Sequence, residues 1–215
     1  LVHVDLSHEE DQIMEIVLSE KNIKQFRNII EDAKALYQDI QEKKDNILEA
    51  VSDWNIPKKI DYQNDVTEMS VKKSIMMPFF YNENKLSNPE RNFINYLDES
   101  KDVEWWYKNG EKESKYFAVP YKDESITKPF FVDFIIMLKN KKIGFFDTKG
   151  GTFINEAMTD GKNDGLLDFL KSDSNYFGGI VTNTKEDGSG VWKVFEKRSQ
   201  KFIRGDLKNW ENLNF

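Results

Sequence analysis

Two nearly continuous apolar runs constrain the fold of this chain most strongly. They cover residues 130–138 and 143–147, and the polar segment Lys139-Asn140-Lys141-Lys142 turns the chain between them. Such runs are typical of neighbouring strands that are buried on both faces of a sheet. Each run nevertheless contains one aspartate, Asp133 within the first and Asp147 at the end of the second. Because a lone buried carboxylate costs several kcal/mol, these two aspartates require partners.

A divalent cation would satisfy both aspartates at once. Carboxylate oxygens are the ligands that Mg²⁺ prefers, and a shared cation also offsets the repulsion between the two carboxylates. Lys149 follows Asp147 by two residues, so both side chains leave the same face of the strand. A lysine beside a metal-held water can orient that water or stabilise charge on a phosphoryl oxygen. Asp133, Asp147 and Lys149 therefore predict a site that hydrolyses phosphodiesters.

The context of Asp147-Thr148-Lys149 carries this prediction, because the tripeptide Asp/Glu-x-Lys is common in the chain. It occurs eight times, starting at positions 32, 42, 83, 99, 113, 147, 160 and 206. Only the copy at 147 closes an apolar strand that follows another apolar strand bearing an aspartate. A structural interpretation stays open, in which Asp133 is a hydrogen-bonded core residue and Asp147 and Lys149 form an exposed strand end.

The pattern along the chain predicts an α/β fold: a mixed central β-sheet flanked by helices, with an N-terminal helical segment. We expect a helical lead-in over residues 1–60, with Ser7 as a cap and a break near 19–22, and a second domain over residues 70–215. The elements expected in the second domain are an edge strand or loop at 75–81, a helix capped by Asn88, strands at 103–108, 116–121, 130–138 and 143–147, a helix at 160–171, and strands at 177–182 and 191–196.

Glu90 is a candidate third acid. It shares one face of the expected helix with Phe93, Ile94 and Leu97, so it heads an apolar stripe and does not point towards solvent. An acidic residue in a first helical turn is also favoured by the helix dipole alone, which keeps a purely structural role open.

Residues 88–151 resemble the PD-(D/E)xK nuclease superfamily, which shares a restriction-endonuclease-like core. The segments that carry the resemblance are Asn88-Pro89-Glu90-Arg91-Asn92-Phe93 with Leu97, Val103-Glu104-Trp105-Trp106-Tyr107-Lys108-Asn109-Gly110, Val132-Asp133-Phe134-Ile135 and Phe146-Asp147-Thr148-Lys149-Gly150. Together they look like the C-terminal endonuclease domain of type III restriction (Res) subunits and related helicase-nucleases. Two features depart from the pattern: Val132 replaces the proline of the motif, and the next helix lacks the Gln-x-x-x-Tyr of the RecB-like branch.

The resemblance implies a metal-dependent endonuclease that hydrolyses DNA phosphodiester bonds. It implies Asp133 and Asp147 as metal ligands with Glu90 assisting, Lys149 as the catalytic lysine, and Mg²⁺ as the cofactor with Mn²⁺ as a substitute. The implied partners are DNA, a helicase or ATPase motor in the same full-length chain, a modification or specificity subunit, and a second copy for double-strand cleavage. The chain contains no Walker A loop and begins Leu1-Val2-His3 without Met, so we expect a fragment of a longer protein.

Composition limits how this chain could hold DNA. The formal net charge of −7 disfavours an unspecific nucleic-acid binder that relies on its whole surface. Local contacts are expected from Lys108, Lys162, Lys193 and Arg198, although the basic stretch at 190–208 is equally well explained as a solvated surface. The absence of cysteine excludes disulfides and thiolate chemistry and is compatible with a cytoplasmic location, and no apolar run is long enough to span a membrane.

Two rival functions remain open at this stage. The same fold could serve as a catalytically inactive module that binds DNA or docks onto a subunit, because a fold does not determine a function. Alternatively, the chain could be a structural interaction domain whose helical lead-in is the working surface, in which case nothing would converge on Asp133 and Asp147.

Overall fold

The computed structural model describes residues 19–45, 54–62, 65–111, 113, 115–123, 126–150, 156–195 and 206–215. The chain divides into two compact units, Leu1–Ile47 and Leu48–Phe215. The predicted first helix with its Ser7 cap lies outside the described residues, as do residues 46–53. Among the described residues, no helix has the length and apolar character needed to cross a membrane.

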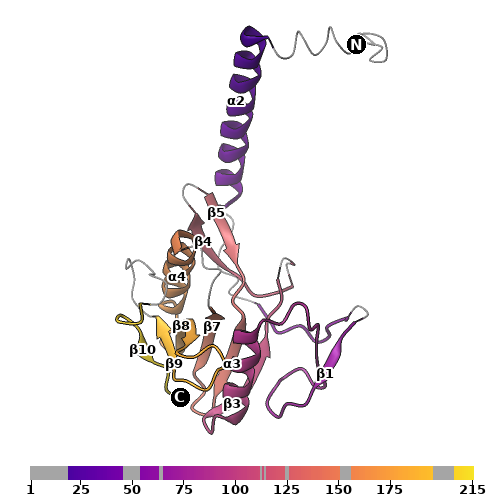
Figure 1. Cartoon of the computed structure of the whole chain (residues 1–215), viewed down its shortest axis with the longest axis vertical. Helices are drawn as coiled ribbons and strands as arrows, with labels where there is room; N and C mark the ends of the chain where they lie inside the picture. The colour runs from indigo at the N-terminus through magenta and orange to yellow at the C-terminus, as the bar shows by residue number, and fades with distance from the viewer. Residues whose placement is uncertain are drawn as a thin grey trace. The chain divides into compact units, whose positions relative to one another are not determined.

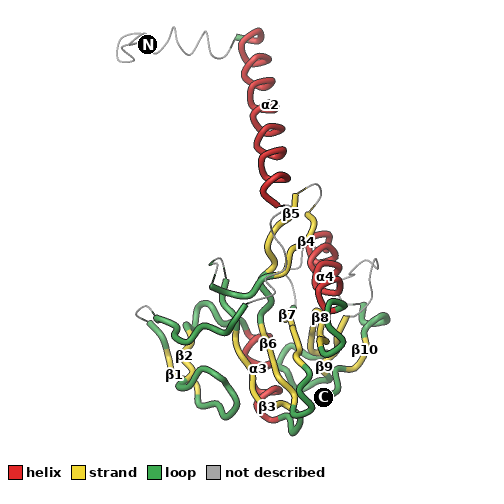
Figure 2. The backbone as a smooth tube through the Cα atoms, turned by 180° about the vertical axis from the view of Figure 1, so that it is seen from behind, coloured by secondary structure: helices red, strands yellow, loops and turns green. Residues whose placement is uncertain are grey.

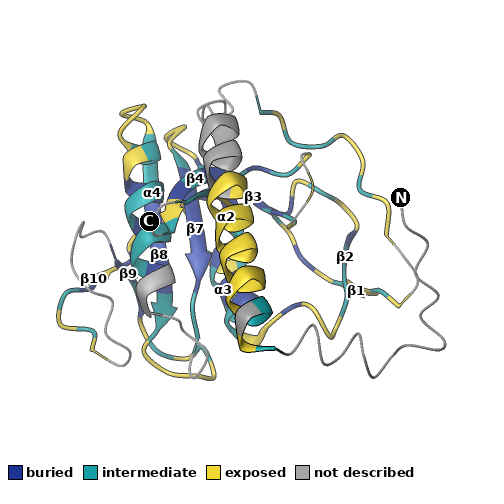
Figure 3. Ribbon diagram, turned by 90° about the horizontal axis from the view of Figure 1, so that it is seen from above, coloured by how far each residue is buried: buried dark blue, intermediate teal, exposed yellow. Residues whose placement is uncertain are grey.

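The first unit contains the helix α2 (Glu20–Asp45). Its apolar residues recur at helical spacing, yet they are exposed: Phe26, Ile29, Ile30, Leu36 and Tyr37 all have large accessible fractions. Figure 3 shows the described part of α2 almost entirely in the colour of exposed residues.

The division between the units falls earlier than the predicted lead-in boundary at residue 60. The Trp54 ring lies 5.9 Å from Tyr107 and 5.4 Å from Phe117, measured between ring centroids. Ile56 and Ile60 pack against the same cluster. Residues 54–60 therefore belong to the α/β unit, because their apolar side chains complete its core.

The second unit is built on a six-stranded mixed sheet, which confirms the predicted fold class (Figure 1). Its strand order is β10-β9-β8-β7-β6-β3, and only the β7–β8 pair is parallel. The strands of this sheet are β3 (Val103–Lys108), β6 (Phe134–Leu138), β7 (Ile143–Thr148), β8 (Tyr176–Asn183), β9 (Trp192–Phe195) and β10 (Glu211–Asn212). The apolar runs predicted to be neighbouring buried strands, β6 and β7, lie side by side at its centre.

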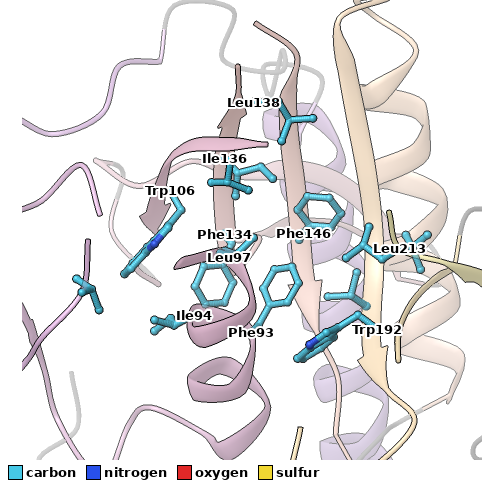
Figure 4. Close-up of a cluster of buried hydrophobic side chains, with 14 of the residues drawn as sticks. Phe93, Ile94, Leu97, Trp106, Phe134, Ile136, Leu138, Phe146, Trp192 and Leu213 are labelled. Atoms are coloured by element: carbon cyan, nitrogen blue, oxygen red, sulfur yellow. The ribbon is translucent and has the colours of Figure 1, made fainter. Parts of the chain in front are cut away.

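Two helices cover opposite faces of this sheet, α3 (Asn88–Glu99) and α4 (Glu156–Leu170). Alternate residues of each strand reach different cores: Phe134 and Phe146 join the α3 residues, whereas Ile135 and Phe145 join Leu166 of α4. Figure 4 shows the α3 core, in which Phe93, Ile94 and Leu97 meet Trp106, Phe134, Ile136 and Phe146. The two-residue alternation of strands thus explains why nearly every position of β6 and β7 is apolar.

Two short hairpins complete the unit (Figure 2). One pairs β1 (Thr67–Met69) with β2 (Phe79–Tyr81), which places the end of the predicted extended segment at 75–81 outside the main sheet. The start of that segment, Ile75, donates to Trp106 O of the edge strand β3 at 2.9 Å. The other pairs β4 (Val119–Asp123) with β5 (Ile126–Phe130). The strand predicted at 116–121 accordingly starts later and joins this hairpin, not the central sheet.

The predicted strand over 130–138 is divided in the structure. β5 ends at Phe130 and β6 begins at Phe134, so Asp133 lies just before a strand and not within one. The Asn109 side chain explains the break, because its amide donates to the carbonyls of Val132 (2.9 Å) and Phe117 (2.8 Å). In a continuous strand, these two carbonyls would instead accept hydrogen bonds from the backbone of a neighbouring strand.

Helix α3 begins one residue earlier than predicted. Ser87, not Asn88, is the cap: its hydroxyl accepts from the Glu90 N–H, and the Glu90 carboxylate accepts from the Ser87 N–H. This reciprocal capping box uses Glu90 at the third helical position. The helix predicted at 160–171 also begins earlier, at Glu156.

Candidate functional site

The register of β6 and β7 brings the two candidate aspartates together. The strands are antiparallel, and Phe134 pairs with Phe146. The residue before Phe134 and the residue after Phe146 are therefore neighbours at the same end of the pair. They are Asp133 and Asp147, as the sequence predicted.

Asp133 is a well-anchored carboxylate. Its Oδ2 accepts hydrogen bonds of 2.7 Å from both the backbone N–H and the hydroxyl of Thr148. Its Oδ1 lies 3.4 Å from the Lys108 ammonium. Burial alone would raise the pKa of Asp133, but Lys108, Lys149 and the Thr148 bonds outweigh burial and hold this pKa below its usual value. Asp133 is therefore ionised and fixed in orientation.

Asp147 lies in a less favourable environment. It is 4% exposed, and its Oδ2 is in ion-pair contact with the Lys149 ammonium. Burial raises the pKa of Asp147 to about 6; the charge of Lys149 opposes this shift and that of Asp133 adds to it. Two adjacent carboxylates thus have their pKa values displaced in opposite directions, a pattern that is enriched at functional sites.

Lys149 is held at the end of β7 by its backbone. Its N–H donates to Val181 O at 2.8 Å, and its carbonyl accepts from the Thr182 hydroxyl at 2.8 Å. Burial would lower the pKa of Lys149, but Asp147 and Asp133 raise it above its ordinary value, so the ammonium stays charged. Lys149 therefore contacts Asp147, and the register of β6 and β7 places Asp133 next to Asp147. The metal and catalytic roles of these three residues stay predictions.

Glu90 also reaches this cluster, through Lys108. The Glu90 Oε1 lies 2.8 Å from the Lys108 ammonium, and its Oε2 accepts from the Ser87 N–H at 2.7 Å. Burial would lower the pKa of Lys108, but Asp133 and Glu90 raise it overall. Both carboxylate oxygens of Glu90 are thus engaged by groups of the protein.

The lysines predicted to contact DNA lie in different surroundings. Lys108 is largely buried between two carboxylates. Lys162 of α4 lies over the rings of Phe130 and Tyr121. Burial, together with the charge of Lys149, lowers the pKa of Lys162. Lys193 lies on β9 and donates to Asn212 Oδ1 at 2.9 Å, and Arg198 falls outside the described residues. Of these four, Lys162 is best placed to add charge beside Asp147.

The donor chemistry fits one divalent cation at the aspartate pair. Mg²⁺ commonly takes one or two protein carboxylates and keeps several waters. Asp147 is a buried carboxylate whose Oδ2 contacts the Lys149 ammonium, so a cation would share this carboxylate with Lys149. Over the part of the chain that is described, no group of three or more His, Asp or Glu side chains is arranged to hold a metal. The fit therefore rests on Asp133 and Asp147 alone.

Two participants were not identified from the sequence. Thr148 anchors Asp133 with two hydrogen bonds. Strand alternation directs the Thr148 side chain to the opposite face from Asp147, and this could have indicated that Thr148 has a different role from Asp147. Ser87 fixes Glu90 through the capping box, and its position three residues before Glu90 is the sequence signature of such a box.

A cavity of about 620 Å³ adjoins the cluster on the side of Glu90 and Lys108. Its lining includes these two residues together with Tyr62 and Phe80.

Fold and site together define an α/β protein with a mixed sheet and a buried cluster of acids and lysines at the ends of its central strands. The model of the YagJ family matches residues 77–213, which is more than half of the chain, so the chain belongs to the YagJ family. The matched region contains Glu90, Lys108, Asp133, Asp147 and Lys149. No curated protein and no solved structure matches the chain.

Proposed function

We propose that this chain is a metal-dependent DNA endonuclease domain of the PD-(D/E)xK type. The observation that carries the proposal is Asp147: a carboxylate that is 4% exposed, whose pKa burial raises to about 6, in ion-pair contact with Lys149 and beside the ionised Asp133. Burial disfavours the charge of this carboxylate, so it is costly to keep in a core. A divalent cation bound to Asp133 and Asp147 would offset that cost.

In this proposal each residue has a distinct task. Bound Mg²⁺ supplies a water of lowered pKa and offsets charge on the phosphate. Asp133 presents a fixed oxygen, because Thr148 holds it with two hydrogen bonds. Asp147 contributes the second carboxylate ligand. The Lys149 ammonium, anchored through its backbone to β8, orients the attacking water or stabilises the negative charge that develops on the phosphoryl oxygens.

The wider assignment follows from the same resemblance. We propose DNA as the substrate, a motor domain elsewhere in a longer chain, a modification or specificity subunit as partner, pairing of two copies for double-strand cleavage, and a cytoplasmic location. Residues 70–215 contain 23 Lys/Arg against 22 Asp/Glu, a net charge of only +1, and this near-neutral balance supports a partner that helps to hold the DNA.

Cleavage of DNA by matched variants tests the proposal. Wild type should nick or cut plasmid and single-stranded DNA in Mg²⁺ or Mn²⁺, and EDTA should stop it. Asp147→Asn and Lys149→Met should be inactive and folded. Asp168→Asn and Lys171→Met are the matched controls, because this exposed pair, 3.7 Å apart, makes the same kind of contact away from the cluster. Equal activity in wild type and both site variants would exclude the assignment.

An inactive module is the second candidate, and one observation favours it. Every carboxylate oxygen of Glu90 and Asp133 already has a protein partner, as expected of a structural ion-pair network. Calorimetric titration with Mn²⁺ separates the two functions. An inactive module should show no metal binding that depends on Asp147.

A further inference from the structure

The Lys108 ammonium lies within a group of three oxygen atoms. They are Glu90 Oε1 at 2.8 Å, Asp133 Oδ1 at 3.4 Å and Asn109 O at 3.5 Å. The three charged side chains are 17%, 11% and 16% exposed for Lys108, Glu90 and Asp133, so solvent screens these contacts only weakly. The ring of Phe134 lies 5.1 Å from the same ammonium and closes one side.

Two carboxylates and a backbone carbonyl are also the donors that a divalent cation takes. Here their position is fixed from two directions. Glu90 is held by the capping box of α3, and Asp133 is held by Thr148 of β7. The cation enclosed by these preset oxygens is the side chain of Lys108, which the β3–β6 pairing of Lys108 with Phe134 brings there.

We propose that Lys108 is a built-in cation that fills the position of a second metal between Glu90 and Asp133, so that the site holds a single divalent ion, at Asp133 and Asp147. This inference rests on the proposed function, and it assigns Glu90 a different role from the one expected from sequence. Glu90 is a positioning residue that acts through Lys108, and it is not a metal ligand.

The charge of the cluster opposes a second ion. Three carboxylates (Glu90, Asp133 and Asp147) are balanced by three ammonium groups (Lys108, Lys149 and Lys162, whose charge also acts on Asp147). One divalent ion gives this cluster two net positive charges. A second ion would add two further positive charges, and it would have to displace Lys108 from its oxygens. Such an excess of buried charge is strongly unfavourable.

The stoichiometry of Mn²⁺ binding tests this inference. It is measured on the full chain by calorimetry and by electron paramagnetic resonance of unbound Mn²⁺. We expect one ion per chain for wild type, none for Asp147→Asn, two for Lys108→Met, and one again for Lys108→Met combined with Glu90→Gln. Lys108→Arg keeps a cation in place and should bind one ion.

Each outcome has a defined meaning. Two ions bound to wild type, or no second ion gained by folded Lys108→Met, overturn the inference and leave the proposed nuclease standing. No ion bound to wild type overturns both. Circular dichroism with and without Mn²⁺ follows the fold of Lys108→Met, whose two carboxylates lose their cation. If that variant folds in neither condition, the double variant decides: one ion supports the inference, and two ions overturn it.

Discussion

Replacing Asp147 by asparagine should make the metal-free protein more stable at neutral pH. Folding raises the pKa of this carboxyl from 3.8 to about 6, because burial disfavours its charge. The folded state therefore binds the proton more tightly than the unfolded state does. The penalty for ionised Asp147 is absent below pH 3.8, grows as the pH rises through 6, and is complete at pH 7. A shift of about two pKa units corresponds to about 3 kcal/mol.

Asparagine has a similar shape and carries no charge at any of these pH values, so it removes that penalty. The assay is urea denaturation of wild type and Asp147→Asn in EDTA, from pH 3.5 to 7.5. The free energy of unfolding of the variant should exceed that of wild type by about 3 kcal/mol at pH 7, and this difference should vanish near pH 3.5. Other carboxyl groups titrate in both proteins and cancel in the difference.

Saturating Mn²⁺ should reverse the order. At a concentration of about 1,000 times its Kd, the ion stabilises wild type by about 4.1 kcal/mol, which exceeds the deficit of about 3 kcal/mol, and it leaves the variant unchanged. A variant that is less stable than wild type in EDTA at pH 7, or a difference that does not change with pH, would refute this reasoning.

Three further predictions concern the residues around Asp147. Thr148→Val removes the hydroxyl that donates to ionised Asp133 and should lower the free energy of unfolding by about 1.5–3 kcal/mol, as measured by urea denaturation. Lys108→Met leaves the charges of Glu90 and Asp133 uncompensated and should lower the free energy of unfolding by about 3–5 kcal/mol without metal. Adding Glu90→Gln should restore most of this loss. A melting temperature of Lys108→Met equal to that of wild type would contradict this prediction. Ser87→Ala removes the observed cap and should cost about 1 kcal/mol, whereas Asn88→Ala should change stability by less than about 0.5 kcal/mol; the opposite order would place the cap at Asn88.

The central part of the fold was predictable because its strands carry strong local signals. The apolar runs that became β6 and β7 are separated by a short polar turn, which forces them to be antiparallel neighbours. Once they pair, Asp133 and Asp147 must lie together. The helix α3 and strand β3 were equally clear, since their apolar residues follow the periods of a helix and a strand.

The division of the 130–138 run could not be predicted from local pattern. Residues on both sides of the break are apolar, and the break depends on a distant side chain, Asn109, which bonds to Val132 and Phe117. In the sequence, Asn109-Gly110 has the composition of an ordinary turn. Its buried role arises only when β3, β4 and β6 come together.

The position of Lys108 depends on tertiary structure in the same way. The sequence shows it at the end of a strand, where a surface contact with DNA is a reasonable expectation. The packing of α3 against β3 places Glu90 opposite it, and the β3–β6 pairing brings Asp133 to its other side. Adjacent candidates such as Ser87 and Asn88 are also hard to separate, because either can cap a helix.

A crystal structure with Mn²⁺ tests the central claim most directly, since the anomalous signal locates the ion without reference to activity. The account predicts a peak within about 2.0–2.6 Å of carboxylate oxygens of both Asp133 and Asp147, with Lys108 still between Glu90 and Asp133. A fully soaked crystal with no peak at these two aspartates, in which Lys149 remains paired with Asp147, would contradict it.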